Sequence, residues 1–273
     1  MSTAEMTRPH RIDSVNKETG NDGTVGKALE ILDLIAGFDR PVRFAELQEV
    51  SPLPKATLYR FVQTLTNQNM LSHSPETGCY SLGARLVRLA HSAWKNASLA
   101  PIARPFVERL SDRVQETVHL AQFDNGNVIF VDKVQVNQTI QTLAQAGMTA
   151  PAYCTGVGKA MLAYLSPKRL EIVLQQQSYY PYTAQTHRDA DSVIRELADI
   201  RAQGVAFDRE EHEDGIISIA APILMDSGRV IGALSVATAT TRTSLTGLMA
   251  HKQTLIETAD QIGAQASQWQ FPS

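Results

Sequence analysis

The sequence has few of the features that stabilise secreted, membrane-spanning or fibrous proteins. Its 273 residues include only two cysteines, Cys79 and Cys154, which cannot form a disulfide framework and are compatible with a reducing compartment. No apolar run approaches the roughly 18 residues of a membrane span. The polar N-terminus has no apolar core of the kind that a secretory signal needs. We therefore expect a cytoplasmic protein without a membrane partner.

The chain does have a globular composition and an uneven distribution of charge. Hydrophobic residues make up 43% and charged residues 19% of the sequence, and the net charge is −3. Residues 50–95 hold five Lys and Arg against one Glu, whereas residues 99–273 hold 14 basic and 18 acidic side chains. A basic module next to a mildly acidic one favours separate roles, and nucleic acid suits the basic module.

Changes in the residue pattern divide the chain into four parts. Residues 1–22 are polar and lack apolar periodicity, which predicts a flexible tail. Residues 23–83 contain three short helical patterns and a hairpin, and residues 84–98 form one further amphipathic helix. Residues 99–273 mix helical and strand patterns in a second domain.

The first domain has the pattern of a winged helix. Helical periodicity covers a first segment from Thr24 to Gly37, a second over residues 43–50, and a third that begins after Pro54. The outward face of the third helix carries small, hydroxyl, amide and guanidinium groups but no carboxylate. Such groups reach phosphates and base edges in a major groove. The alternative is a helical bundle whose third helix is merely solvated, but a predicted hairpin around residues 75–78 favours the winged helix.

The second domain is predicted to be α+β with a mainly antiparallel sheet. Asp124-Asn125-Gly126 between two apolar strands is a strong hairpin signal. Strands are expected over residues 117–123, 127–134, 139–145, 205–208, 216–225 and 229–239, and helices over 158–165, 168–176, 192–203 and 246–269. The helix over residues 84–98 carries an apolar stripe, which we interpret as a contact between subunits.

The order of these segments resembles the IclR family of bacterial transcription regulators. The resemblance is carried by VGKALEILDLIA, LPKATLYRFVQTL, ETVHLAQFDNGNVIFVDKV, PAYCTGVGKAMLAYL, GVAFDREEHEDGIISIAAPI and VIGALSVA. It implies a winged helix-turn-helix domain, a linker helix and a GAF-like effector-binding domain. It also implies homodimers, often paired into tetramers, on palindromic double-stranded operators. Within the family the chain is most similar to repressors of small-acid or lactone catabolism, such as the Agrobacterium regulator of γ-butyrolactone breakdown.

The resemblance assigns residues to both partners. The helix after Pro54 would be the recognition helix, and the residues expected at DNA are Arg43, Lys55, Thr57, Tyr59, Arg60, His73 and Ser74. Tyr59 could instead pack against the wing, and His73 could simply be solvated. The residues expected at a small carboxylic acid or semialdehyde effector are Thr142, Leu143, Cys154, Gly156, Val157, Asp208, Ser218 and Ser235. Many family members have cysteine where this chain has Ser218. Backbone N–H groups of the loop Thr155-Gly156-Val157-Gly158 favour an anion.

Other interpretations of the same residues remain open. No cofactor is required, but Cys154, Asp208, His119 and His212 carry donor types that zinc accepts, although their spacing is not a zinc signature. Cys154 could equally be a small buried residue. As an enzyme, the chain would be a thiol hydrolase with Cys154 as nucleophile, His212 as base and Asp208 as orienting group. A third possibility is an architectural protein without effector binding. The leading prediction is a non-enzymatic regulator that acts as a repressor.

Overall fold

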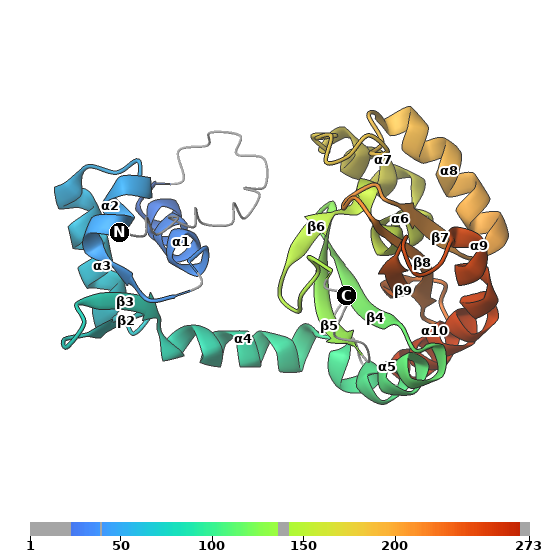
Figure 1. Ribbon diagram of the computed structural model, residues 1–273, viewed down its shortest axis with the longest axis horizontal. Coiled ribbons are helices and arrows are strands. Elements are labelled where there is room, and N and C mark those ends of the chain that lie inside the picture. Colours follow the sequence, from blue (N-terminus) through green and yellow to red (C-terminus); the bar gives the residue numbers. More distant parts are fainter. Residues whose placement is uncertain (1–22, 39, 136–141, 268–273) are drawn as a thin grey trace. The chain divides into compact units, whose positions relative to one another are not determined.

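The computed structural model describes residues 23–38, 40–135 and 142–267. The chain divides into two compact units, residues 1–94 and 95–273, which are described separately (Figure 1). The boundary falls inside the helix expected over residues 84–98 rather than after it. The expected flexible tail, residues 1–22, lies outside the described residues.

The first unit is built from three helices and a small antiparallel sheet. The three strands pair in the order β1-β3-β2. The elements are α1 (Gly23–Ala36), β1 (Val42–Arg43), α2 (Phe44–Val50), α3 (Lys55–Asn67), β2 (Leu71–Ser74) and β3 (Cys79–Leu82). One apolar cluster joins all three helices to the hairpin, and its fully buried members include Ile31, Leu47, Leu58 and Val62. Helix, turn, helix and hairpin in this order form a winged helix.

The buried faces of the first two helices differ from the sequence prediction. Val25 and Leu29 belong to the apolar repeat of the first helical segment, but they are 71% and 52% exposed, while Ile31 is fully buried. Val50 is also exposed. The apolar stripe of α1 is wider than the surface that α2 and α3 can cover, so periodicity alone did not identify the residues that face inward.

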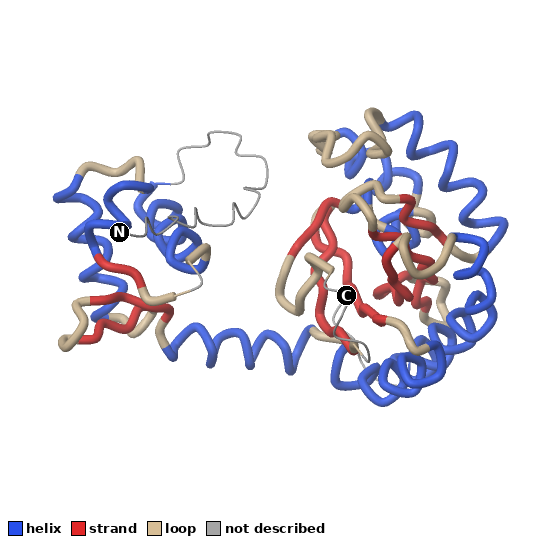
Figure 2. The backbone as a smooth tube through the Cα atoms, viewed as in Figure 1, coloured by secondary structure: helices blue, strands red, loops and turns tan. Residues whose placement is uncertain are grey.

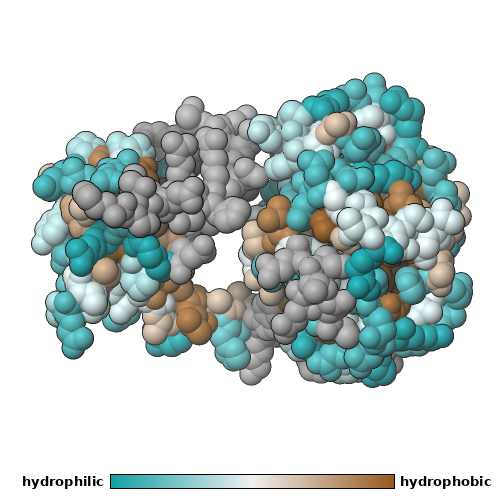
Figure 3. Space-filling model, in the orientation of Figure 1, coloured by the Kyte–Doolittle hydropathy of each residue, from teal (hydrophilic) through white to brown (hydrophobic). Residues whose placement is uncertain are grey.

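Helix α4 (Ala84–Ala97) leaves the winged helix with apolar residues on its surface. Val87 and Leu89 are 71% and 52% exposed within the chain. A hydrophobic patch is visible over the first turns of α4, whereas the surface over α7 and α8 is mostly hydrophilic in the same view (Figure 3). A contiguous exposed apolar patch commonly marks a protein contact.

The second unit is a six-stranded antiparallel sheet covered by helices on both faces (Figure 2). The strands lie in the order β6-β5-β4-β9-β8-β7. They are β4 (Thr117–Asp124), β5 (Asn127–Val134), β6 (Thr149–Pro151), β7 (Ala206–Arg209), β8 (Ile216–Leu224) and β9 (Val230–Ala239). The helices are α5 (Ala100–Val114), η1 (Ala152–Cys154), α6 (Gly156–Leu162), α7 (Pro167–Gln175), α8 (Ala190–Gln203), α9 (Leu245–Leu248), η2 (Met249–His251) and α10 (Lys252–Ser267).

Alternation along the strands decides what lies on each face of the sheet. On β8, Ile217 and Ile219 point to the side covered by α5 and α10, where one large apolar cluster forms. Ser218 and Ala220 point to the other side, which α6 covers. Because side chains in a strand alternate, the α6 side of the sheet can carry polar groups without disturbing the first core.

The expected hairpin is present, but the described part of one expected strand does not form a strand. Asn125 and Gly126 both have positive φ, 45° and 90°, as the tight turn between β4 and β5 requires. Residues 142–145 of the expected strand over 139–145 are not part of a strand, and the rest of that segment lies outside the described residues. Instead β6, over Thr149–Pro151, pairs with β5. Among the described helices, none is both long and apolar enough to span a membrane.

Candidate functional site

The outward face of α3 is free of the core and rich in hydrogen-bonding groups. Leu58, Phe61 and their neighbours on the inner face are buried, whereas Lys55 and Arg60 are exposed. The guanidinium of Arg60 lies 5.9 Å from the centre of the Phe61 ring. No acidic residue occurs within α3, so nothing on this helix opposes the approach of phosphate.

Two further residues expected at DNA are held by local packing. Tyr59 is 54% exposed and packs edge-on against Phe44, with ring centres 5.7 Å apart. Arg43 is exposed at the start of α2, and its backbone N–H donates to the Glu46 carboxylate. Glu46 also forms an ion pair with Arg40. Thr57 is half-buried at the start of α3.

The wing presents one of its two expected residues outward. His73 is exposed on β2, and its ring lies 4.7 Å from that of Tyr80 on β3. Ser74 is half-buried, and its hydroxyl accepts from the backbone N–H of Thr77 within the turn. Ser74 therefore supports the hairpin, while His73 is the residue of this pair that is accessible.

The second unit contains a cavity between the sheet and the first turn of α6. It is small, about 50 Å³, which is room for roughly four water-sized groups. Six of the eight residues expected at an effector line it, and they are Thr142, Gly156, Val157, Asp208, Ser218 and Ser235. Strand register explains why they meet: Asp208 pairs with Ser218, and Ser235 pairs with His119.

His119 links the sheet to the opposite wall of the cavity. Its Nε2 lies 3.0 Å from the Thr142 hydroxyl, and its Nδ1 lies 3.5 Å from the Ser235 hydroxyl. Burial, with a smaller contribution from the charge of Lys133, lowers the pKa of His119 to about 3. The ring is therefore neutral near pH 7, with one donor and one acceptor nitrogen. It serves as a hydrogen-bonding group in the cavity.

Asp208 supplies the cavity with a carboxyl group whose pKa is raised. One of its oxygens accepts from the backbone N–H of Glu211 at 2.8 Å. Burial, followed by the negative charge of Glu211, raises the pKa of Asp208 to about 7. A carboxyl with this pKa can donate or accept a hydrogen bond near neutral pH.

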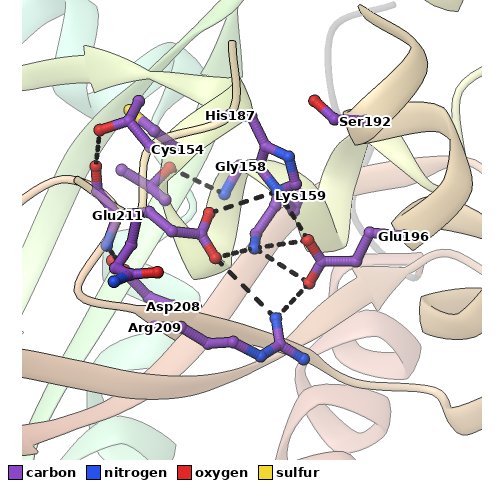
Figure 4. A network of polar contacts seen from close by, with 12 residues as sticks. Cys154, Gly158, Lys159, His187, Ser192, Glu196, Asp208, Arg209 and Glu211 are labelled. Carbon is purple, nitrogen blue, oxygen red and sulfur yellow. Dashed lines mark hydrogen bonds and ion pairs between the residues drawn. The ribbon is translucent and has the colours of Figure 1, made fainter. Parts of the chain in front are cut away.

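Beside the cavity lies a buried ion network centred on Lys159 (Figure 4). Its ammonium group is completely buried and binds both oxygens of Glu196, at 2.9 and 3.0 Å, and one oxygen of Glu211. Arg209 and His187 bind Glu196 from the other side. Lys159 belongs to the same short helix as Gly156, and Glu211 binds Asp208, so the network fixes two walls of the cavity.

Two residues expected at the effector do not line the cavity. Leu143 is 48% exposed, and only its backbone N–H is engaged, by the Glu213 carboxylate. Cys154 is completely buried in the apolar cluster beneath α6. Burial, aided by the charge of Asp208, raises the pKa of the Cys154 thiol well above its ordinary value. The hydrolase alternative needed an accessible thiolate with a lowered pKa, and it is therefore wrong.

The four residues considered for zinc do not assemble in the described part of the chain. The set contained Cys154, which is separated from the cavity, and the donor atoms of His119, Asp208 and His212 do not come together as a cluster. A different group, His187, Glu196 and Glu211, does lie within 4.8 Å of one another. Lys159 and Arg209 already neutralise its two carboxylates, so a further cation would leave this buried group with excess positive charge.

Sequence reasoning missed several residues of the site. Phe130, Ala144, Glu213, Ile216 and Ala237 line the cavity, and an acidic run such as residues 208–214 is ordinarily solvated. In fact Glu211 is only 3% exposed. The alternation of β8, which places Ile216 and Ser218 on one face, is the signal that could have identified part of this lining.

Two family models together match most of the chain. They are the IclR helix-turn-helix domain, over residues 24–75, and the C-terminal domain of the bacterial transcriptional regulator IclR, over residues 91–264. The HTH-type transcriptional regulator XynR of Escherichia coli is 30% identical over 219 residues, which cover 80% of this chain and 87% of XynR. KdgR of Escherichia coli, also an HTH-type transcriptional regulator, is 28% identical over 258 residues, 94% of this chain and 98% of KdgR.

Solved structures agree with these matches. The crystal structure of Thermotoga maritima IclR has a TM-score of 0.74 at 27% identity and covers 89% of this chain and 98% of its own. The winged helix, the antiparallel effector domain and the non-enzymatic, DNA-binding role predicted from the sequence are confirmed. The narrower resemblance to lactone-catabolism repressors stays a prediction. The chain belongs to the IclR family of bacterial transcription regulators.

Proposed function

We propose that this regulator is a repressor that leaves its operator when a small carboxylic acid or semialdehyde enters the cavity of the second unit. Helix α3 would lie in the major groove, with Lys55 and Arg60 toward DNA, and His73 of the wing would reach the adjacent backbone or minor groove. The function requires double-stranded DNA and one effector, and it requires no cofactor. Since bacterial operators lie in the cytoplasm, the protein acts there.

The observation that carries this proposal is the composition of the cavity. Hydroxyls from Ser218, Ser235 and Thr142 converge with neutral His119 on one small space. These groups can hydrogen-bond an aldehyde or a carboxyl oxygen, and the limited volume favours a ligand with few non-hydrogen atoms. The ligand must bind the DNA-competent and incompetent states unequally, because otherwise it cannot change operator affinity.

A homodimer is part of the proposal, and so is the pairing of two such dimers. The exposed apolar residues of α4 support it, since Val87 and Leu89 have no apolar cover within the described chain. Two copies that pair through this helix would present two recognition helices to a palindromic operator.

The test is a gel shift of the purified protein on its own upstream intergenic DNA, with and without succinate semialdehyde and a panel of small carboxylic acids. We expect specific binding that one of these compounds abolishes. Specific binding that no acid or semialdehyde alters, together with unchanged oligomeric state, would contradict the effector assignment. Loss of all specific binding would contradict the operator-binding role of the winged helix.

A further inference from the structure

The charges that line the cavity are unusual for a site that takes an acid. Its described lining contains the carboxyl groups of Asp208 and Glu213 but no lysine or arginine. A carboxylate ligand would therefore enter a space that already holds two acidic groups and no lining cation.

Among the described residues, the two basic side chains of the ion network beside the cavity are paired with carboxylates, and a third, Lys133, is held at a backbone carbonyl. Lys159 is bound to Glu196 and Glu211, and Arg209 to Glu196. Lys133 lies just outside the lining, where its ammonium group is 3.4 Å from the Thr142 carbonyl. Burial raises the pKa of Glu213, and the hydrogen bond from the Leu143 backbone and the charge of Lys133 partly oppose this rise. These pairs leave Asp208 as the carboxyl without a cation of its own.

The groups around Asp208 disfavour ionisation of its carboxyl more than they favour it. The Glu211 backbone N–H donates to it, but the negative charges of Glu211 and Glu213 both oppose its ionisation. The titratable, charged and hydroxyl groups that face it from η1, α6, β4, β8 and the 211–213 loop are Cys154, Lys159, His119, Ser218, Glu211, His212 and Glu213. His119 is neutral and Lys159 is committed to its two glutamates, so neither offsets a second carboxylate beside Asp208.

We propose that the cavity takes a monocarboxylic acid together with one proton, which Asp208 shares with the ligand carboxylate, and that it excludes dicarboxylates. The inference rests on the proposed acid or semialdehyde effector and specifies its class. Two carboxyl groups that share one proton form a strong hydrogen bond, whereas two adjacent carboxylates repel each other. The second carboxylate of a diacid would find no cation and no second proton donor of this kind.

The electrostatics of the unliganded protein agree with this arrangement. Burial and the neighbouring Glu211 raise the pKa of Asp208 to about 7. Below that pH the proton is already on Asp208 and the ligand binds as its anion. Above it, the proton must be taken from solvent when the complex forms, so affinity falls as pH rises.

The experiment is isothermal titration calorimetry of the full-length protein with succinate semialdehyde from pH 6 to 8.5, in two buffers with different enthalpies of ionisation. We expect almost no proton uptake at pH 6 and close to one proton per ligand at pH 8.5. The dissociation constant should rise about tenfold per pH unit above pH 7, as uptake of one proton requires. Succinate, nearly identical in size, should bind about a hundredfold more weakly at pH 7.5 because of its second charge.

Two variants separate the proposal from its alternatives. Asp208→Asn keeps a hydrogen-bond donor that cannot ionise, so the pH slope and the proton uptake should disappear while succinate semialdehyde still binds. The matched control, Asp214→Asn, removes an exposed carboxylate of the same loop that does not line the cavity, and it should keep the slope. Thermal melts of both variants establish that they fold.

The possible failures can be distinguished. Binding of succinate semialdehyde with a pH-independent dissociation constant and no proton uptake would overturn proton sharing while leaving the effector class intact. Equal affinity for succinate and succinate semialdehyde would overturn the exclusion of diacids. If neither this compound nor any acid of the panel binds at any pH, both the inference and the proposed effector fail, whereas operator binding is tested separately by the gel shift.

Discussion

The ammonium group of Lys159 lies 2.9 Å from the carboxylate of Glu196, although 37 residues separate them in the chain. Lys159 is completely buried on α6, and Glu196 is on α8. Together with Glu211, which binds the same ammonium group, this pair ties the helix at the cavity to the outer layer of the domain. The first predictions concern this network.

Replacing Lys159 by methionine should strongly destabilise the second unit. The substitution leaves the carboxylates of Glu196 and Glu211 buried without their shared cation, and loss of one partner from a buried ion pair costs about 3–5 kcal/mol. The free energy of unfolding, measured in urea, should fall by that amount. Lys168→Met, an exposed lysine on α7, is the control and should change little. Adding Glu211→Gln to Lys159→Met should recover part of the loss, and a double variant no more stable than the single one would contradict this account.

The contribution of Glu196 to stability should disappear in acid. Burial opposes ionisation of this carboxyl, but the hydrogen bond from His187 and the charges of Lys159 and Arg209 outweigh it and hold the pKa of Glu196 well below its ordinary value. A group with a lowered folded pKa stabilises the protein above its unfolded pKa of about 4.3, and it loses this effect as pH falls toward the folded value.

The measurement compares wild type with Glu196→Gln in urea from pH 3 to 7. The stability difference should be constant above about pH 5 and shrink below about pH 4. Asp199→Asn, an exposed residue on the same helix, should give no difference at any pH. A gap between wild type and Glu196→Gln that stays the same down to pH 3 would show that the charge of Glu196 is not what matters.

Two neighbouring glycines of α6 should respond differently to alanine. A methyl group on Gly158 would collide with the backbone of Ala152, so Gly158→Ala should lower the midpoint of thermal unfolding. A methyl group on Gly156 would lie 2.8 Å from the Ser218 hydroxyl, which can rotate away. Gly156→Ala should therefore keep the fold but narrow the cavity and weaken effector binding. Equal losses of stability in the two variants would refute this distinction.

Arg60→Ala should weaken operator binding without affecting the effector. A lost phosphate or base contact costs about 1–3 kcal/mol, or roughly a tenfold to hundredfold loss of affinity. The control is Lys168→Ala, which removes an equal charge from the exposed surface of α7. Fluorescence anisotropy on operator and on unrelated DNA, at two salt concentrations, shows whether Arg60 contributes to specificity or only to phosphate binding. Unchanged operator affinity in Arg60→Ala would remove this residue from the interface.

Leu89→Asp should dissociate the proposed dimer. The leucine is half exposed on α4 within a single chain, so a charge is harmless to a monomer but costly in an apolar contact between copies. Sedimentation analysis should show monomers, and operator affinity should fall because two half-sites are no longer linked. Arg88→Asp tests whether any new acidic charge on this helix has the same effect. Retention of the wild-type mass by Leu89→Asp would place the subunit contact elsewhere.

Most of the fold could be predicted from local patterns, whereas much of the site could not. The Asn125-Gly126 turn and the periodic apolar residues of α3 are local signals, and both gave correct elements. The fully buried state of Lys159 depends on Glu196 and Glu211, which lie 37 and 52 residues further along. A lysine in a short helix and a glutamate in an acidic run are ordinarily solvated, and only tertiary packing brings them together.

The resemblance to the family identified cavity residues correctly where strand pairing determines which way a side chain points. It was wrong for residues whose direction depends on local packing. Asp208, Ser218 and Ser235 lie on one face of three paired strands and reach the cavity. Cys154 and Leu143 are close to cavity residues in sequence, but one turns into the apolar core and the other outward. Proximity to cavity residues in the sequence does not show in which direction a side chain points.

The strand order of the second unit also bears on synthesis of the protein. The central strand β9 separates β4 from β8, and it supplies Ser235 opposite His119. A nascent chain that has emerged only as far as β8 therefore cannot form the complete cavity. The strands on its two sides, β4 and β8, are joined only when β9 has been synthesised. The winged helix ends about 150 residues earlier and has local contacts, which form quickly. During translation the winged helix can thus fold well before the effector-binding cavity of the second unit is complete.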